Sequence, residues 1–184
     1  MFHSFLSRRT FLKASLVGAS LLLSRGVLSG TAFADDLPEG RLLLYNIHTN
    51  ERLDVTYRKP SGEYDPQALS ALNWIMRCHY TGKSVDMDVR VIEFLNTVSK
   101  MAGPHNEIHI ISGYRSPEYN QLLRREGHHV ARNSMHLKGR AIDFNIPRVE
   151  LAVLRRTALS LRYGGVGYYP GDFVHLDSGR FRTW

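Results

Sequence analysis

Two short tracts in the C-terminal half of the chain, residues 140–146 and 173–177, alternate between apolar residues and polar or small ones. Successive side chains of a strand point to opposite faces, so each tract predicts a strand with one face toward a core. The core-facing positions are Ile142, Phe144, Ile146, Val174 and Leu176. Half-buried strands of this kind need a sheet that is covered on one side, and this requirement limits the chain to folds that contain one.

The remaining segments supply helices and further strands. Further strands are predicted at residues 41–48, 52–57, 107–111 and 166–169. Helices are predicted to begin at Asp65-Pro66, at Asp86 or Asp88, at Ser116-Pro117 and at Arg148. The expected fold class is therefore α+β, a single domain with helices packed on an antiparallel sheet.

The first 34 residues have the order of an export signal. Arg8 and Arg9 precede about ten apolar residues, too few to cross a bilayer, and Ala32-Phe33-Ala34 is a small-x-small cleavage site. The arrangement resembles a twin-arginine signal, which a receptor reads as an address. We expect cleavage after Ala34, a periplasmic location and a mature domain of residues 35–184 without a stable membrane anchor. An uncleaved anchor is the alternative.

Charge and cysteine content exclude several classes of protein. The chain has 24 lysines and arginines against 17 acidic residues. Four of these basic residues and none of the acidic ones fall within the predicted signal, so the mature domain is only mildly basic. It has no long basic run, and no nucleic-acid partner is expected. Cys78 is the only cysteine, which rules out an intramolecular disulfide, and its apolar surroundings predict a buried side chain rather than a nucleophile.

Polar side chains on the non-core face of the two tracts suggest chemistry. Asp143 lies on that face of the first tract, and His175 and Asp177 lie on that face of the second. Gly139 lets the chain turn, so that His136 can fold back toward Asp143. Two imidazoles and one carboxylate suit a catalytic zinc, because three protein ligands leave a fourth position for water. A solvated His–Asp pair is the alternative, since the ligands meet only if the fold joins the segments.

Several motifs together resemble a known family. The pattern Ser-x-His-x-x-Gly-x-Ala-x-Asp at residues 134–143, followed by a histidine in a later strand, is similar to that of the zinc D-Ala-D-Ala peptidase and hedgehog-like family. The tract Ser112-Gly113-Tyr114-Arg115-Ser116 resembles the arginine motif of that family. Residues 44–49, 164–170 and 173–177 are similar to its periplasmic murein endopeptidase branch. The resemblance covers essentially the whole mature chain and implies a hedgehog/D-Ala-D-Ala-peptidase-like fold.

The resemblance also implies roles for individual residues. It implies one zinc ion bound by His136, Asp143 and His175, and the hydrolysis of peptide cross-links in peptidoglycan. It further implies that Arg115 binds a substrate carboxylate or the developing oxyanion, a task suited to the fork of donors on a guanidinium. A structural ion pair is the alternative role for Arg115.

The expected general base is a carboxylate near the last histidine. Many relatives carry an acid three residues before this ligand, and Asp172 has that spacing to His175. Asp177, on the same strand face as His175, is the second candidate, or it orients the ligand. His128 and His129 come directly after Gly127 in a polar loop, and they are expected to be a solvated pair.

Three functions compatible with these motifs remain to be separated. The first is an endopeptidase acting on cross-linked stem peptides of peptidoglycan. The second is a D-alanyl-D-alanine carboxypeptidase using the same metal chemistry, for which a blind pocket rather than an open groove would be expected. The third is a non-catalytic wall-binding module, which would have no need for a water-activating metal.

Overall fold

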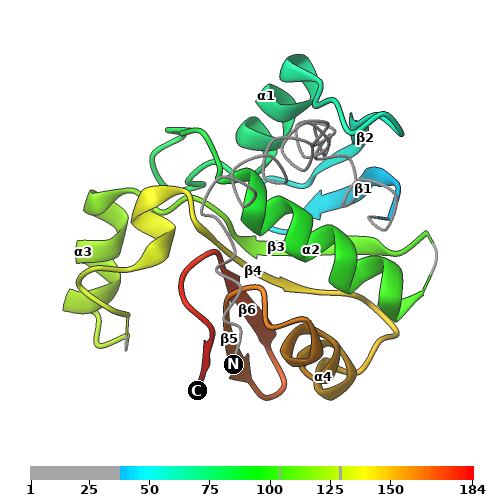
Figure 1. Ribbon diagram of the computed structural model, residues 1–184. Helices are drawn as coiled ribbons and strands as arrows, with labels where there is room; N and C mark the ends of the chain where they lie inside the picture. Colours follow the sequence, from blue (N-terminus) through cyan, green and yellow to red (C-terminus); the bar gives the residue numbers. More distant parts are fainter. Residues whose placement is uncertain (1–37, 104, 129) are drawn as a thin grey trace, which may run out of the picture. The chain divides into compact units, whose positions relative to one another are not determined.

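The computed structural model describes residues 38–103, 105–128 and 130–184, and the predicted signal at residues 1–34 lies outside them. Figure 1 shows a sheet with helices packed against it. The strands are β1 (Gly40–Asn46), β2 (Glu51–Arg58), β3 (Glu107–Ser112), β4 (Ala141–Asn145), β5 (Gly165–Tyr169), β6 (Phe173–Asp177) and β7 (Arg182–Thr183). The α-helices are α1 (Pro66–Ile75), α2 (Val89–Ala102), α3 (Pro117–Arg125) and α4 (Leu151–Leu161), with a 3₁₀ helix η1 (Met135–Lys138).

The sheet has the strand order β2-β1-β3-β4-β6-β5-β7. Most neighbours are antiparallel, but β1 pairs with β3 and β5 pairs with β7 in parallel. The predicted α+β class is confirmed, whereas the expectation of a purely antiparallel sheet is corrected to a mixed one. The physical reason is the long connection from β2 through α1 and α2 to β3, which lets the chain return beside β1 in the same direction.

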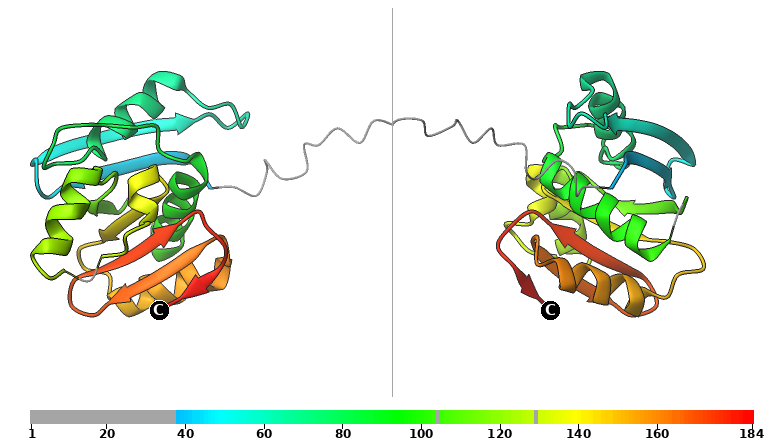
Figure 2. Two further views of the ribbon diagram at one scale, coloured as in Figure 1. Left: turned by 90° about the vertical axis from the view of Figure 1, so that its left-hand side faces the viewer. Right: turned by 45° about the vertical axis from the view of Figure 1, so that its right-hand side comes forward.

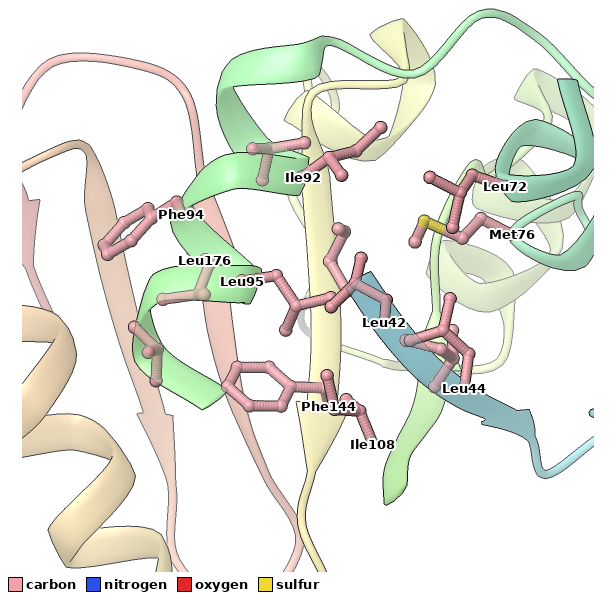
Figure 3. Packing of buried hydrophobic residues seen from close by; sticks show 14 of the residues in the cluster. Leu42, Leu44, Leu72, Met76, Ile92, Phe94, Leu95, Ile108, Phe144 and Leu176 are labelled. Atoms are coloured by element: carbon pink, nitrogen blue, oxygen red, sulfur yellow. The ribbon is translucent and has the colours of Figure 1, made fainter. Parts of the chain in front are cut away.

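The core lies between the sheet and the helices α2 and α4, which pack beside each other on one face (Figure 2). In Figure 3, Leu95 of α2 faces Leu42 of β1 and Phe144 of β4. None of these three side chains is more than 2% exposed. Burying a side chain of this size contributes about 1.5–3 kcal/mol, so the alternating apolar positions of the strands are what attach the helices to the sheet.

Aspartate and serine side chains fix the starts of three helices. Asp65, Asp88 and Ser116 each accept hydrogen bonds from backbone N–H groups in the first turn of α1, α2 and α3. Asp88 also accepts a hydrogen bond of 2.7 Å from the Ser178 hydroxyl, which ties the start of α2 to the chain leaving β6. Within the described ranges, no helix combines the length and the apolar character needed to cross a membrane.

The face of the sheet opposite α2 and α4 carries Asp143 on β4 and His175 on β6, paired directly across the two strands. Gly139 ends η1 in the left-handed conformation, with φ of 61°. A Cβ at Gly139 would lie 2.7 Å from the carbonyl oxygen of Asp86, so both conformation and space call for glycine. This tight turn from η1 into β4 brings His136 above Asp143, as the sequence predicts.

Candidate metal centre

The three predicted ligands form one buried cluster. His136 Nε2 lies 3.2 Å from His175 Nδ1 and 3.2 Å from Asp143 Oδ2. His175 Nδ1 lies 2.7 Å from Asp143 Oδ1. None of the three residues is more than 8% exposed. The cluster could hold a metal ion, because each residue offers one ligand atom to a common point.

The spacing of these atoms fits a tetrahedral ion. Ligand bonds of about 2.0–2.1 Å in tetrahedral geometry place ligand atoms ~3.3 Å from one another. Two of the observed separations, of 3.2 Å, are close to this value, whereas His175 Nδ1 lies nearer, at 2.7 Å, to the other oxygen of Asp143, so side-chain adjustment would be needed to bring three ligand atoms to bonding distance of one centre. Two nitrogens and a carboxylate oxygen are also the donor types that zinc takes.

Hydrogen bonds orient both imidazoles for this task. His136 Nδ1–H donates to the carbonyl oxygen of Gly113 at 2.7 Å, which leaves a lone pair on Nε2 toward the cluster. His175 Nε2 lies 3.2 Å from Asp177 Oδ2, which directs Nδ1 toward the cluster. Gly113 itself has no room for a side chain, since a Cβ would lie 2.6 Å from Met76 Cβ. The backbone carbonyl of Gly113 therefore fixes the orientation of the His136 ring, and Asp177 of β6 fixes that of the His175 ring.

The charge states suit a cation. Burial raises the pKa of Asp143, but His136 and His175 outweigh burial and hold this pKa well below its usual range. Burial lowers the pKa of His136, and Asp143 offsets only part of that effect, so the ring is neutral at neutral pH. Burial also lowers the pKa of His175, but hydrogen bonds to Asp143 and Asp177 outweigh it and raise this pKa. A metal ligand must be unprotonated at the coordinating atom, so metal binding would compete with protonation of His175 Nδ1.

The two candidate bases lie in different surroundings. Both oxygens of Asp177 are engaged, by the Arg182 guanidinium and by the Gly179 backbone N–H as well as by His175 Nε2. Asp177 contacts the ring of His175 on the edge away from the cluster, which is an orienting position. Asp172 lies exposed in the turn between β5 and β6, outside the residues that line the cleft. The structure thus brings Asp177 to the site and gives Asp172 no contact with it.

Arg115 is buried beside the cluster with few of its donors used. It is 8% exposed, and its Nε is buried without a hydrogen-bond partner among the described residues. The terminal nitrogens reach Asn120 Oδ1 at 3.4 Å, Ser112 Oγ at 3.5 Å and Asp143 Oδ2 at 3.6 Å, all of them long contacts. A buried guanidinium with weak partners is suited to receiving an anionic group from outside the protein.

Two adjoining cavities lie beside the cluster. The first, of about 470 Å³, is lined by His136, Asp143 and His175 together with Tyr169 and Trp184. The second, of about 270 Å³, is lined by His48 and His79. The two cavities share the lining residues Arg115, His128, Val130, Asp143 and Phe173, so they meet at these residues, and together they make up the groove beside the cluster.

Several residues of this groove are not singled out by the sequence motifs. His128 lines both cavities rather than standing clear of the cleft, while His129 lies outside the described residues. Trp184 packs over Gly167, where a Cβ would lie 2.9 Å from the indole ring. A glycine within a strand beside aromatic residues is the one sequence signal that could have indicated this close packing.

Two imidazoles and a carboxylate brought together beside a cleft are a donor set that hydrolases with a single metal site use. A family model described as peptidoglycan L,D-endopeptidase MepK matches residues 37–184. The peptidoglycan L,D-endopeptidase MepK of Escherichia coli strain K12 is 38% identical over 165 residues, which cover 88% of this chain and 90% of that protein. The probable peptidoglycan L,D-endopeptidase MepK of Haemophilus influenzae is 41% identical over 150 residues, 80% of each chain. The chain belongs to this family of murein endopeptidases.

Proposed function

We propose that this protein is a zinc-dependent endopeptidase that hydrolyses peptide cross-links of peptidoglycan at an L,D bond. Membership of the family supports the reaction and the substrate class. The observation that carries the proposal is the groove made of two adjoining cavities, one lined by the whole His-Asp-His cluster and the other by Asp143 and residues further from it. A cross-link continues on both sides of the bond to be cut, and such a groove accommodates both arms. A carboxypeptidase needs only a pocket closed on one side.

Each residue of the cluster has a role in this proposal. His136 Nε2, Asp143 and His175 Nδ1 would hold the zinc, and Asp177 fixes the ring of His175. When bound, zinc would supply the Lewis acidity that activates a water molecule for hydrolysis. Arg115 lines the groove with only long contacts to its terminal nitrogens, and it would hold a substrate carboxylate or the oxygen that becomes negative during hydrolysis.

The test is digestion of purified muropeptides of known linkage. Dimers joined through an L,D bond (3-3) should be converted to monomers, and dimers joined through a D,D bond (4-3) should be cut more slowly. A chelator should abolish turnover, and added zinc should restore it. Release of terminal D-alanine without cleavage of dimers would instead establish a carboxypeptidase. Binding of muropeptides with no cleavage in the presence of zinc would establish a wall-binding module.

We propose Asp172 as the general base on its acid-x-x-His spacing alone, since its side chain lies exposed outside the cleft, and replacement by asparagine tests this role. Loss of a general base typically lowers turnover about 10²- to 10⁴-fold. Asp172→Asn should therefore reduce kcat in that range while zinc content stays at one per chain. Asp177→Asn is the matched comparison, and it should weaken zinc binding about 10- to 100-fold, as loss of an outer partner does. A change in kcat of less than threefold for Asp172→Asn would show that Asp172 is not the general base.

We further propose that residues 1–34 are a twin-arginine signal, cleaved after Ala34 to leave residues 35–184 as the catalytic domain in the periplasm. Changing both Arg8 and Arg9 to lysine should retain the precursor in the cytoplasm, because the export receptor reads the arginine pair. Fractionation of cells and mass spectrometry of the mature N-terminus measure this. Normal periplasmic delivery of the double variant would assign export to the general secretion route.

A further inference from the structure

A stacked pair of imidazoles forms one wall of the second cavity. His48 follows β1 and His79 follows α1, and their rings stack with centroids 3.9 Å apart and planes 19° apart. The ring of Tyr119, from α3, meets His79 edge-on at 4.8 Å. Tyr80 stacks on Tyr119 from the outside, at 5.1 Å. His79 is thus held from two sides in one orientation, although it belongs to a loop.

The hydrogen bonds of the two imidazoles differ. His48 Nε2–H donates to the carbonyl oxygen of Ile111 at 3.1 Å, so its donor is used within the protein. Neither ring nitrogen of His79 has a hydrogen-bond partner among the described residues, and the ring lines the cavity. Burial lowers the pKa of His79, and His48 and Arg115 lower it further, so the ring is neutral and keeps one N–H to donate. A fixed donor without a partner in a groove is suited to a ligand.

The charges around this donor select the kind of ligand. Arg115 and His128 line the same cavity, and of the described residues there the only acid is Asp143, which faces the two histidines of the cluster. Arg115 lines this cavity as well as the one that holds the whole cluster. A cavity lined by a guanidinium and imidazole donors favours a carboxylate over a neutral or cationic group.

We propose that His79 determines substrate specificity, by donating a hydrogen bond to a free carboxylate of the stem peptide in the cavity that His48 and His79 line. Arg115 supplies the balancing positive charge, and the stack with His48 and Tyr119 positions the imidazole. This assignment rests on the proposed function, because the ligand is an arm of a peptidoglycan cross-link. It adds a selective contact at a distance from the metal cluster.

The test compares His79→Phe on two substrates, muropeptide dimers with the free carboxylate and the same dimers with that carboxylate converted to a carboxamide. Phenylalanine keeps the stack and removes the N–H. A hydrogen bond to a charged group corresponds to about 10- to 100-fold, so kcat/KM on the carboxylate dimer should fall by that factor. On the carboxamide dimer it should change less than threefold. His79→Gln, which keeps an N–H donor, should retain more of the preference than His79→Phe.

Tyr80→Phe is the matched control, because it alters the same aromatic group outside the cavity. It should leave kcat/KM unchanged on both dimers. Binding of both dimers to metal-free protein, measured by calorimetry, separates this inference from the proposed function. Cleavage of neither dimer by the zinc-loaded wild type would end the proposed function, while a His79-dependent preference in binding would still support the subsite. The subsite would be overturned if His79→Phe lowered kcat/KM or affinity equally for both dimers. It would also be overturned if His79→Phe lowered neither quantity for the carboxylate dimer.

Discussion

Replacement of His136 by asparagine is expected to remove zinc binding and hydrolysis together while the protein stays folded. The side-chain amide of asparagine can donate to the Gly113 carbonyl oxygen, as His136 Nδ1–H does, but offers no lone pair at the position of Nε2. Removal of a residue that only hydrogen-bonds to a metal ligand lowers metal affinity by up to about 100-fold. Removal of the ligand His136 itself should lower zinc affinity by more than that. Metal analysis, thermal unfolding and cleavage of cross-linked dimers measure the three effects.

Two further variants make this result interpretable. His136→Ala loses the hydrogen bond to Gly113 as well as the ligand, so it should be less stable than His136→Asn and equally inactive. His109→Asn changes a histidine of β3 whose ring contacts Glu107, and it should keep both zinc and activity. Cleavage at the wild-type rate by His136→Asn would mean that the protein is not a metallopeptidase of the proposed kind.

Replacement of Arg115 by alanine is expected to slow turnover about 10²- to 10³-fold, the typical effect of losing one preorganised donor to a developing oxyanion. Zinc content should stay unchanged, because Arg115 approaches Asp143 Oδ2 only to 3.6 Å and leaves the oxygens of that carboxylate to the histidines. Single-turnover cleavage and metal analysis on the same samples measure the two properties.

Lysine at position 115 separates charge from geometry. Arg115→Lys keeps a cation but loses the planar fork, so its turnover should lie between those of wild type and Arg115→Ala. Loss of zinc or of folding in Arg115→Ala would assign the arginine a structural role, as an anchor between Asn120, Ser112 and Asp143.

Local pattern predicts the elements that carry the cluster. Phe173–Asp177 has the same bounds in prediction and structure, because alternation and the preceding Pro170-Gly171 turn are both short-range signals. Asp88 caps α2 as one of two predicted starts. In contrast, β7 spans only Arg182–Thr183, too short for alternation to register, and its pairing with β5 depends on the folded chain.

Contacts between distant segments also limit how much of the site the sequence predicts. The outward facing of Asp143 and His175 follows from alternation, and the His136 motif completes the cluster. The helix α1 ends at Ile75, before His79, and the ring of His79 stacks on His48 from a distant segment. No sequence pattern describes that contact, nor the unused donors of Arg115, because both depend on distances between segments that only the fold sets.

The position of Trp184 has a practical consequence for protein engineering. Its backbone pairs with Val166 and Tyr168 at the edge of the sheet, its indole donates to the Tyr169 hydroxyl, and its ring lines the cavity that holds the cluster. Residues joined after Trp184, such as a purification tag, would leave the protein at the rim of that cavity. A tag placed there would compete with one arm of the substrate, so an affinity handle on the mature domain belongs directly before residue 35, in place of the predicted signal, where protease treatment can remove it.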